Sequence, residues 1–152
     1  MNALAFSAST WYRNSMKARI IAGLTFLVLL AASCATGPVE IPENMTPMEL
    51  IQKAQEASDM NRYAVSLQYY QAIIDRFPYD IDSICAAEYE IAFIHYKQKK
   101  YDTARERFNG LLERYDIPDA ELLPQQFRIL ANIVLKRIDE LESGRKGAAS
   151  KS

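Results

Sequence analysis

After residue 46 the apolar positions recur every three to four residues, and prolines or short polar turns interrupt them four times. The first helix is predicted to begin at Thr46, which can cap it ahead of Pro47 and Glu49, and to end near Met60. Further helices are predicted at Tyr63–Phe77, at Asp82–Tyr96 with Asp82 as its cap, and at Asp102–Tyr115, with a last one from about Pro124 to residue 143. The pattern therefore predicts an all-α fold.

Two of these segments repeat each other at a constant offset of 38 residues. The equivalent pairs are Tyr63 and Tyr101, Ser66 and Ala104, Tyr70 and Phe108, Ile74 and Leu112, Arg76 and Arg114, and Phe77 and Tyr115. A repeat of this length is typical of stacked helical hairpins, none of which can bury its apolar face alone. We expect two such hairpins, followed by a helix that caps the stack.

Small residues recur where the two helices of each hairpin should cross. They are Ala54 and Ser66 in the first hairpin, and Ala92 and Ala104 in the second. A larger side chain there would push the backbones apart, at a cost of about 1–3 kcal/mol. The aromatic residues of the repeat are then expected to fill the angle between neighbouring hairpins.

This combination of small and aromatic positions with a closing proline resembles the tetratricopeptide repeat. The matching residues are Leu50, Ala54, Tyr63, Ser66, Tyr70 and Pro78, then Ile91, Ala92, Tyr101, Ala104 and Phe108. In the second unit the proline comes late, at Pro118, so the pattern is looser there. The resemblance implies an α-solenoid of two hairpins over residues 47–143, with the first helix of each hairpin lining a concave face.

The residues expected on that concave face are the candidate partner-binding residues. They are Ile51, Gln55 and Asp59 in the first unit, and Tyr89, Phe93, Tyr96 and Lys97 in the second. Three aromatic side chains on one groove would hold an extended or helical peptide. The alternative interpretation is that some of these aromatic residues pack against the adjacent hairpin.

Composition and charge narrow the classes of function. After Ser33 the chain holds 15 basic and 19 acidic residues, a net charge of −4, which argues against a nucleic-acid partner. The single histidine, His95, has no nucleophile or paired acid arranged around it in the sequence, and no phosphate-binding loop or metal-ligand spacing is found. We therefore expect neither an enzyme nor a cofactor, metal or small-molecule substrate.

The N-terminal 33 residues have the features of a bacterial export signal. An uncharged apolar run, residues 20–32, follows Lys17 and Arg19 and would span only about 20 Å as a helix. Small residues then lead directly to Cys34, an arrangement that resembles the lipobox of bacterial lipoproteins and implies cleavage before Cys34 and acylation of its sulfur. A soluble signal peptide that leaves Cys34 as an ordinary thiol is the alternative. We expect translation to begin at Met16.

The lipid would determine where the protein resides. Each buried methylene adds about 0.8 kcal/mol, so two or three acyl chains, palmitate among them, would hold the chain firmly in a bilayer. Ala35, in place of aspartate, implies an outer-membrane lipoprotein facing the periplasm, with the cell surface as the alternative. Residues 34–46 are predicted to form a lipidated tether and residues 144–152 a disordered tail.

A narrower resemblance follows from the order of these segments. The lipobox, the acidic tether Val39–Glu43, the helix with Ala54–Ala57, the segment Tyr63–Pro78 and the junction Tyr96–Tyr101 resemble the N-terminal half of BamD-like lipoproteins. Members of that family usually carry about five repeats and serve the outer-membrane β-barrel assembly machinery. The resemblance implies a scaffold that binds envelope proteins. A stand-alone periplasmic adaptor for cell-wall or division complexes is the alternative.

Overall fold

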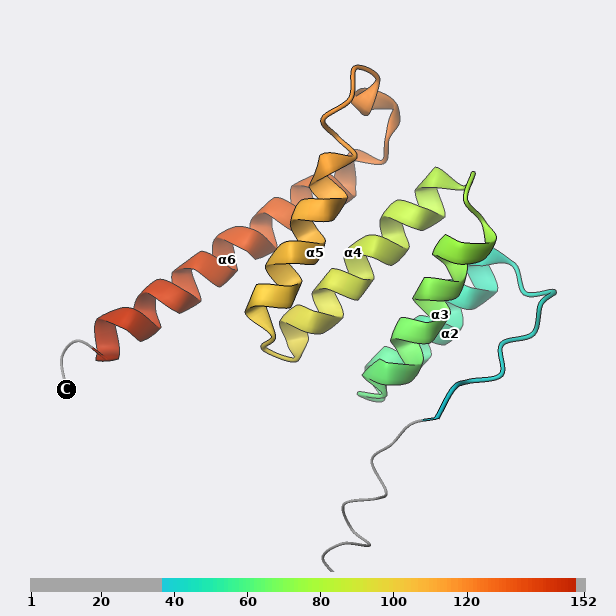
Figure 1. The fold of residues 1–152 in the computed structure, drawn as a ribbon, viewed down its shortest axis with the longest axis horizontal. Coiled ribbons are helices and arrows are strands. Elements are labelled where there is room, and N and C mark those ends of the chain that lie inside the picture. Colours follow the sequence, from blue (N-terminus) through green and yellow to red (C-terminus); the bar gives the residue numbers. More distant parts are fainter. Residues whose placement is uncertain (1–36, 150–152) are drawn as a thin grey trace, which may run out of the picture. The chain divides into compact units, whose positions relative to one another are not determined.

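The structure, a computed structural model, describes residues 37–149, so the predicted signal peptide and Cys34 lie outside the described residues. From Pro38 onward the chain forms one unit, to which the description below is confined. Within it every regular element is a helix, which confirms the all-α prediction (Figure 1). In chain order the elements are α2 (Pro47–Asp59), α3 (Tyr63–Arg76), α4 (Ile81–Lys97), α5 (Tyr101–Glu113), the short 3-10 helix η2 (Ala120–Leu122) and α6 (Gln125–Ala149).

The two helical hairpins, α2–α3 and α4–α5, have turns of the same construction. Asn61 and Lys99, which lie 38 residues apart, both adopt the left-handed conformation, with φ of 57° and 60°. After each of them an amide closes the turn: Arg62 N donates to Ala57 O at 2.8 Å, and Lys100 N donates to His95 O at 3.0 Å. The sequence repeat is therefore also a repeat of backbone geometry.

The first helix starts where the sequence predicts. Glu49 N donates to Thr46 Oγ1 at 3.3 Å, and Thr46 N donates to Glu49 Oε2 at 2.8 Å, so each residue satisfies an amide of the other. At α4 the predicted cap, Asp82, is wrong. Asp80 caps this helix, because its Oδ1 accepts from Ser83 N at 3.1 Å and its Oδ2 from the Ser83 hydroxyl at 2.8 Å.

The four small residues at the helix crossings are completely buried, as predicted. Ala54, Ser66, Ala92 and Ala104 have no exposed surface. The Ser66 hydroxyl donates to Ala54 O at 2.7 Å, so α2 and α3 approach closely enough for a side chain of one helix to bond the backbone of the other. Serine at this position thus satisfies its hydroxyl while keeping the volume small.

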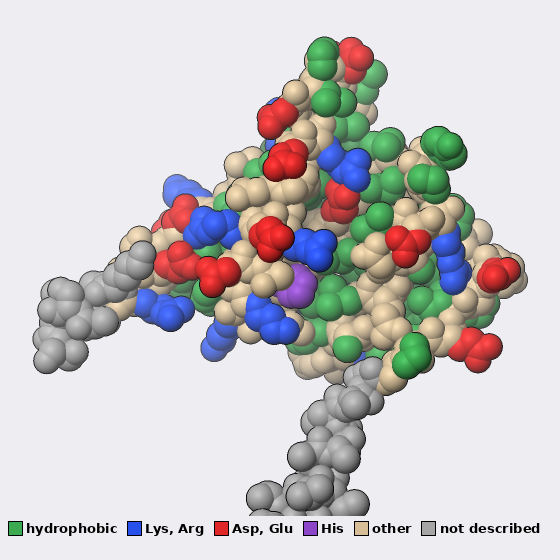
Figure 2. All heavy atoms as spheres, viewed as in Figure 1, with side chains coloured by type: hydrophobic (Ala, Val, Ile, Leu, Met, Phe, Trp, Pro, Cys, Tyr) green, Lys and Arg blue, Asp and Glu red, His purple; other side chains and the backbone are tan. Residues whose placement is uncertain are grey.

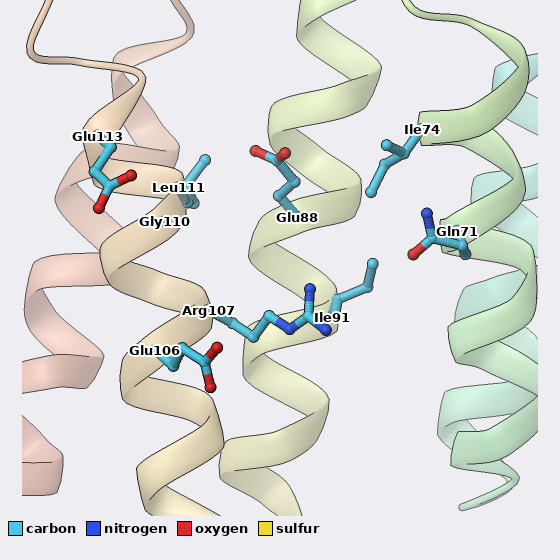
Figure 3. Close-up of a pocket in the computed structure, with 9 residues that line it drawn as sticks. All are labelled: Gln71, Ile74, Glu88, Ile91, Glu106, Arg107, Gly110, Leu111 and Glu113. Carbon is cyan, nitrogen blue, oxygen red and sulfur yellow. The ribbon is translucent and has the colours of Figure 1, made fainter.

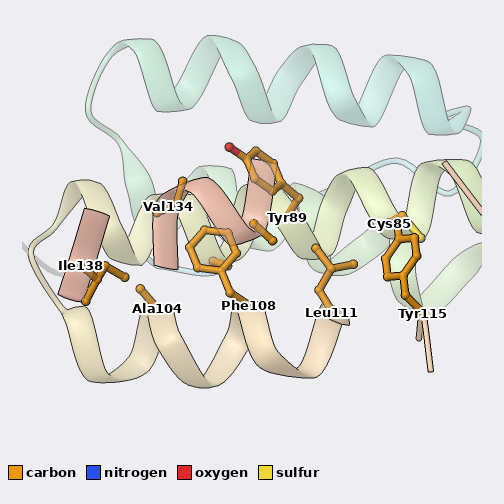
Figure 4. Close-up of a cluster of buried hydrophobic side chains, with 10 residues drawn as sticks. Cys85, Tyr89, Ala104, Phe108, Leu111, Tyr115, Val134 and Ile138 are labelled. Atoms are coloured by element: carbon orange, nitrogen blue, oxygen red, sulfur yellow. The ribbon is translucent and has the colours of Figure 1, made fainter. Parts of the chain in front are cut away.

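Helix α4 lies at the centre of the fold and packs against α2, α3, α5 and α6. On one side of it, a hydrophobic cluster around Leu50, Tyr70 and Ile73 joins the first hairpin to α4. On the other, a cluster around Phe108 joins α4 and α5 to α6 (Figure 4). Charged pairs reinforce the second cluster: Arg114 binds Glu88 of α4 through two contacts of 2.6 Å, and Arg105 binds Asp139 of α6 at 2.7 Å.

Two segments that were predicted to be irregular are more ordered than expected. Part of the predicted tether lies along α3, because Arg76 donates to Ile41 O at 3.0 Å and to Pro42 O at 2.8 Å, and Val39 N donates to Gln68 Oε1 at 2.7 Å. From Val39 onward it is a strap on the helical unit. The tail predicted to be disordered from Gly144 is helical through Ala149, because α6 continues to that residue.

Gly110 provides a test of the helix assignments. It lies inside α5, on an exposed surface, and a Cβ added there would have no atom within 4 Å. Gly110→Ala is therefore expected to raise the free energy of unfolding by about 0.5–1 kcal/mol, because glycine loses more backbone entropy in a helix than alanine does. Urea denaturation followed by circular dichroism measures this. Gly144→Ala, near the end of α6, is the matched control and should gain less stability. A Gly110→Ala variant that is less stable than the wild type would contradict the assignment of Gly110 to an exposed helical position.

Candidate partner-binding face

The predicted aromatic residues of α4 form one continuous row. The rings of Tyr89 and Phe93 stack with centroids 5.8 Å apart, and those of Phe93 and Tyr96 with centroids 5.6 Å apart. Tyr101 at the start of α5 extends the row, 6.0 Å from Tyr96. Residues spaced by three and four share one face of a helix, so the sequence alone could indicate this arrangement. Phe93 and Tyr96 are half-buried and keep part of their rings available.

Tyr89, in contrast, is almost completely buried. Only 8% of its surface is exposed, and its ring lies 5.7 Å from Phe108 of α5 and 5.8 Å from Phe127 of α6. Tyr89 thus packs against the second helix of its own hairpin and against α6, and not against the adjacent hairpin as the alternative interpretation has it. The physical reason is that α6 closes over this end of α4. Gln55 of α2, by contrast, is exposed.

Lys97 is exposed but has partners within the chain. Its ammonium donates to Ser58 Oγ at 2.5 Å, and it lies 5.2 Å from the ring centroid of Tyr63 and 5.6 Å from that of Phe93. A cation over two aromatic faces is held by the negative potential of both rings. The sequence pattern singled out Lys97 and Phe93 but gave no sign that Ser58 and Tyr63 would complete this arrangement.

Two acidic residues, Glu90 and Asp59, act electrostatically in the same region. Burial raises the pKa of Glu90, while the charge of Lys97 opposes that rise and the charge of Asp59 adds to it. Tyr70 is only 1% exposed, and its hydroxyl has no hydrogen-bond partner among the described residues. Burial also raises the pKa of Tyr70, and the negative charges of Glu90 and Asp59 raise it further. We call these seven residues the Lys97 cluster: Ser58, Asp59, Tyr63, Tyr70, Glu90, Phe93 and Lys97.

A separate groove of about 430 Å³ lies between α3, α4 and α5 (Figure 3). Ile91 and Leu111 are buried and form its apolar floor with Ile74. Gly110 and five polar or charged residues complete its lining: Gln71, Glu88, Glu106, Arg107 and Glu113. Figure 2, in the view of Figure 1, shows hydrophobic side chains bordered by charges of both signs on this face. No spacing in the sequence indicated this groove, because its walls come from three helices.

The residues with the most reactive side chains are part of the packing. Cys85 is completely buried, and burial raises the pKa of its thiol, which disfavours the nucleophilic thiolate. The pKa of His95 is lowered by burial and by the positive charges of Lys100 and Arg107. Over residues 37–149 no three histidine, cysteine or carboxylate side chains gather in the way a metal site requires.

Comparison with known proteins gives one relative to report. An uncharacterized protein of Treponema pallidum (strain Nichols) is 34% identical over 124 residues, which are 80% of this chain and 48% of the relative. The chain thus spans about half the length of the curated relative that it matches. No protein-family model and no solved structure matches the sequence. In the part of the chain that the structure describes, every helix is too short or too polar to cross a membrane.

Proposed function

We propose that this protein is a lipid-anchored scaffold that binds envelope proteins through the face formed by α2 and α4. The observation that carries the proposal is the half-exposed pair Phe93 and Tyr96, which lies beside the exposed Lys97 on a helix held by four neighbours. Aromatic side chains that are already ordered lose little entropy on binding and are frequent among residues that dominate interface energies. Cys34 would hold the scaffold at the membrane.

The proposed architecture is a tetratricopeptide-like solenoid of two hairpins with α6 as its cap. The matched turns at Asn61 and Lys99 and the buried small residues at both crossings support this architecture. In such a stack the first helices, α2 and α4, line the concave face, and a terminal helix covers apolar surface that would otherwise be exposed. The contact of Phe127 with Tyr89 is the contact that a cap would make.

A role in outer-membrane β-barrel assembly is the specific form of the proposal. It rests on the resemblance of the lipobox, strap and first hairpin to BamD-like lipoproteins. A stand-alone periplasmic adaptor is the second candidate, because the half-exposed aromatic pair Phe93 and Tyr96 would serve a partner from a cell-wall or division complex equally well. Both functions use the same face, so the identity of the partner distinguishes them.

Crosslinking in living cells tests the proposal. A photoreactive phenylalanine analogue is placed at Tyr96 and, as a control, at the exposed position Asn109 on α5. We expect a protein captured at Tyr96 and not at Asn109. Mass spectrometry then identifies it: a barrel-assembly subunit supports the first candidate, and a cell-wall or division protein supports the second. Equal capture at both positions would contradict a binding face on α4.

Phe93→Ala is expected to weaken binding of the captured partner by about 10- to 30-fold. The variant removes a ring from the middle of the aromatic row while the buried small residues at the crossings remain. Affinity is measured by titration with the purified partner, and circular dichroism verifies the fold. Tyr79→Ala is the matched control, since Tyr79 is an aromatic residue with 96% of its surface exposed in the α3–α4 connection. A folded Phe93→Ala variant with unchanged affinity would refute the role of this face.

A further inference from the structure

We propose that the Lys97 cluster is a binding site for a cationic side chain, lysine or arginine, of a partner segment, and that Lys97 of the same chain occupies it when no partner is bound. The site lies on the binding face described above, so its biological role rests on the proposed function. The proposal assigns a chemical class to the partner, namely a segment that carries a basic residue.

An aromatic and hydroxyl shell lies around the Lys97 ammonium. Tyr63 of α3 and Phe93 of α4 present their faces to Lys97 Nζ at 5.2 and 5.6 Å, and Ser58 of α2 accepts its hydrogen bond at 2.5 Å. Three helices thus contribute to one cation position. Recognition of ammonium groups by proteins uses this kind of aromatic cage. Because these contacts are to the ammonium, a lysine or arginine head group from another chain could make them too.

The negative charges of the cluster also favour a bound cation. Asp59 and Glu90 both act on this region, while Lys97 is the basic residue that acts on Glu90. Burial raises the pKa of the Glu90 carboxyl, so its negative charge is poorly solvated and gains from a nearby cation. When the Lys97 side chain turns outward, that cation has to be replaced. A basic residue of the partner would replace it, whereas an acidic residue would face two carboxylates.

Within residues 37–149 the hydroxyl of Tyr70 is an unpaired polar group in the same cluster. It is buried, with the residue 1% exposed, and has no partner among the described residues, although the charges of Glu90 and Asp59 both reach it. Buried polar groups are rarely left unpaired. The Lys97 ammonium does not pair with it, whereas an entering guanidinium, whose N–H donors form a wider fork, would supply the missing donor. The exposed Lys97 side chain has a flexible four-carbon stem, which allows it to move aside.

Chemical rescue of Lys97→Ala tests the site without any partner. The full chain in detergent is heated with n-butylammonium chloride, which reproduces the lysine side chain, or with sodium chloride at the same ionic strength. We expect butylammonium to raise the Tm of Lys97→Ala by roughly 5 °C at about ten times its dissociation constant, and to raise the wild-type Tm much less, because Lys97 competes for the site there. Butylammonium that fails to raise the Tm of Lys97→Ala above the sodium chloride value would overturn the proposal.

Two further variants identify the groups responsible. Lys53→Ala removes an exposed lysine that pairs with Glu56 at 2.8 Å on α2, and butylammonium should not rescue it. Adding Glu90→Gln to Lys97→Ala should abolish the rescue. Equal rescue of Lys53→Ala, or rescue that persists with Glu90→Gln, would overturn the proposal.

A variant that does not fold has to be distinguished from a site that does not bind a cation. Should Lys97→Ala fail to fold, butylammonium is titrated into the wild type, and shifts of the Tyr63 and Phe93 ring resonances that vanish in Glu90→Gln support the site; their absence overturns it. Because rescue needs no partner, it can succeed even where crosslinking at Tyr96 fails. The failure of this inference and the failure of the proposed function are thus distinguishable.

Discussion

Phe108→Ala is expected to lower the free energy of unfolding by about 3–5 kcal/mol. Phe108 has no exposed surface and lies inside the cluster that joins α4, α5 and α6, with its ring 5.7 Å from that of Tyr89 (Figure 4). Truncation leaves a cavity that three helices cannot close without losing the contacts of Leu111 and Ile138. Since small domains are stable by about 5–15 kcal/mol, this single change removes a large part of the total. Urea denaturation measures it.

The control for this prediction comes from α6 itself. Ile129 is apolar but 57% exposed, so Ile129→Ala deletes a similar type of side chain without opening a cavity and should cost well under half as much. If the two variants lose equal stability, α6 does not pack on Phe108 as the structure places it. That result would also remove the cover from Tyr89 and return it to the candidate binding residues.

The helical hairpins were predictable because two kinds of information in the sequence agree. Periodicity located the helices, and the 38-residue offset paired Ser66 with Ala104 and Tyr70 with Phe108, all four of which are buried. A residue that must be small at a helix crossing leaves a signal at a single position. The left-handed conformation of Lys99 in the second turn left no such signal, because lysine has no preference for that conformation. Only the equivalence of Lys99 with Asn61 in the repeat indicates it.

The candidate site was predictable only in part, because a sequence shows which face of a helix is apolar but not which neighbour covers it. Tyr89 and Phe93 have the same spacing signal, yet Phe127 of α6 covers the first and leaves the second half-exposed. Two of the three partners of Lys97, Ser58 and Tyr63, come from α2 and α3, up to 39 residues away. The contacts between Arg76 and the strap could not be predicted for the same reason. The guanidinium of Arg76 donates to carbonyl groups that lie 34 and 35 residues away in the sequence.

The anchor is the feature of the proposed function that a single substitution should affect most. In a Cys34→Ser chain we expect incorporation of labelled palmitate to fall to background, because no thiol remains at the position where the lipobox resemblance places the acyl chains. Cleavage before residue 34 should fail as well, so the chain should accumulate as the longer precursor. Metabolic labelling and intact-mass measurement of the membrane fraction record both results.

Cys85 provides the control within the same chain, because it is the other of the two cysteines. Its side chain is completely buried in α4, and burial raises the pKa of its thiol, so it should not compete for acylation. A Cys85→Ala chain should therefore keep wild-type labelling and the wild-type mature length. Palmitate that persists in Cys34→Ser would contradict the anchor at Cys34. A wild-type chain that is cleaved normally but takes up no label would instead favour a soluble signal peptide, and the scaffold would then act without attachment to the bilayer.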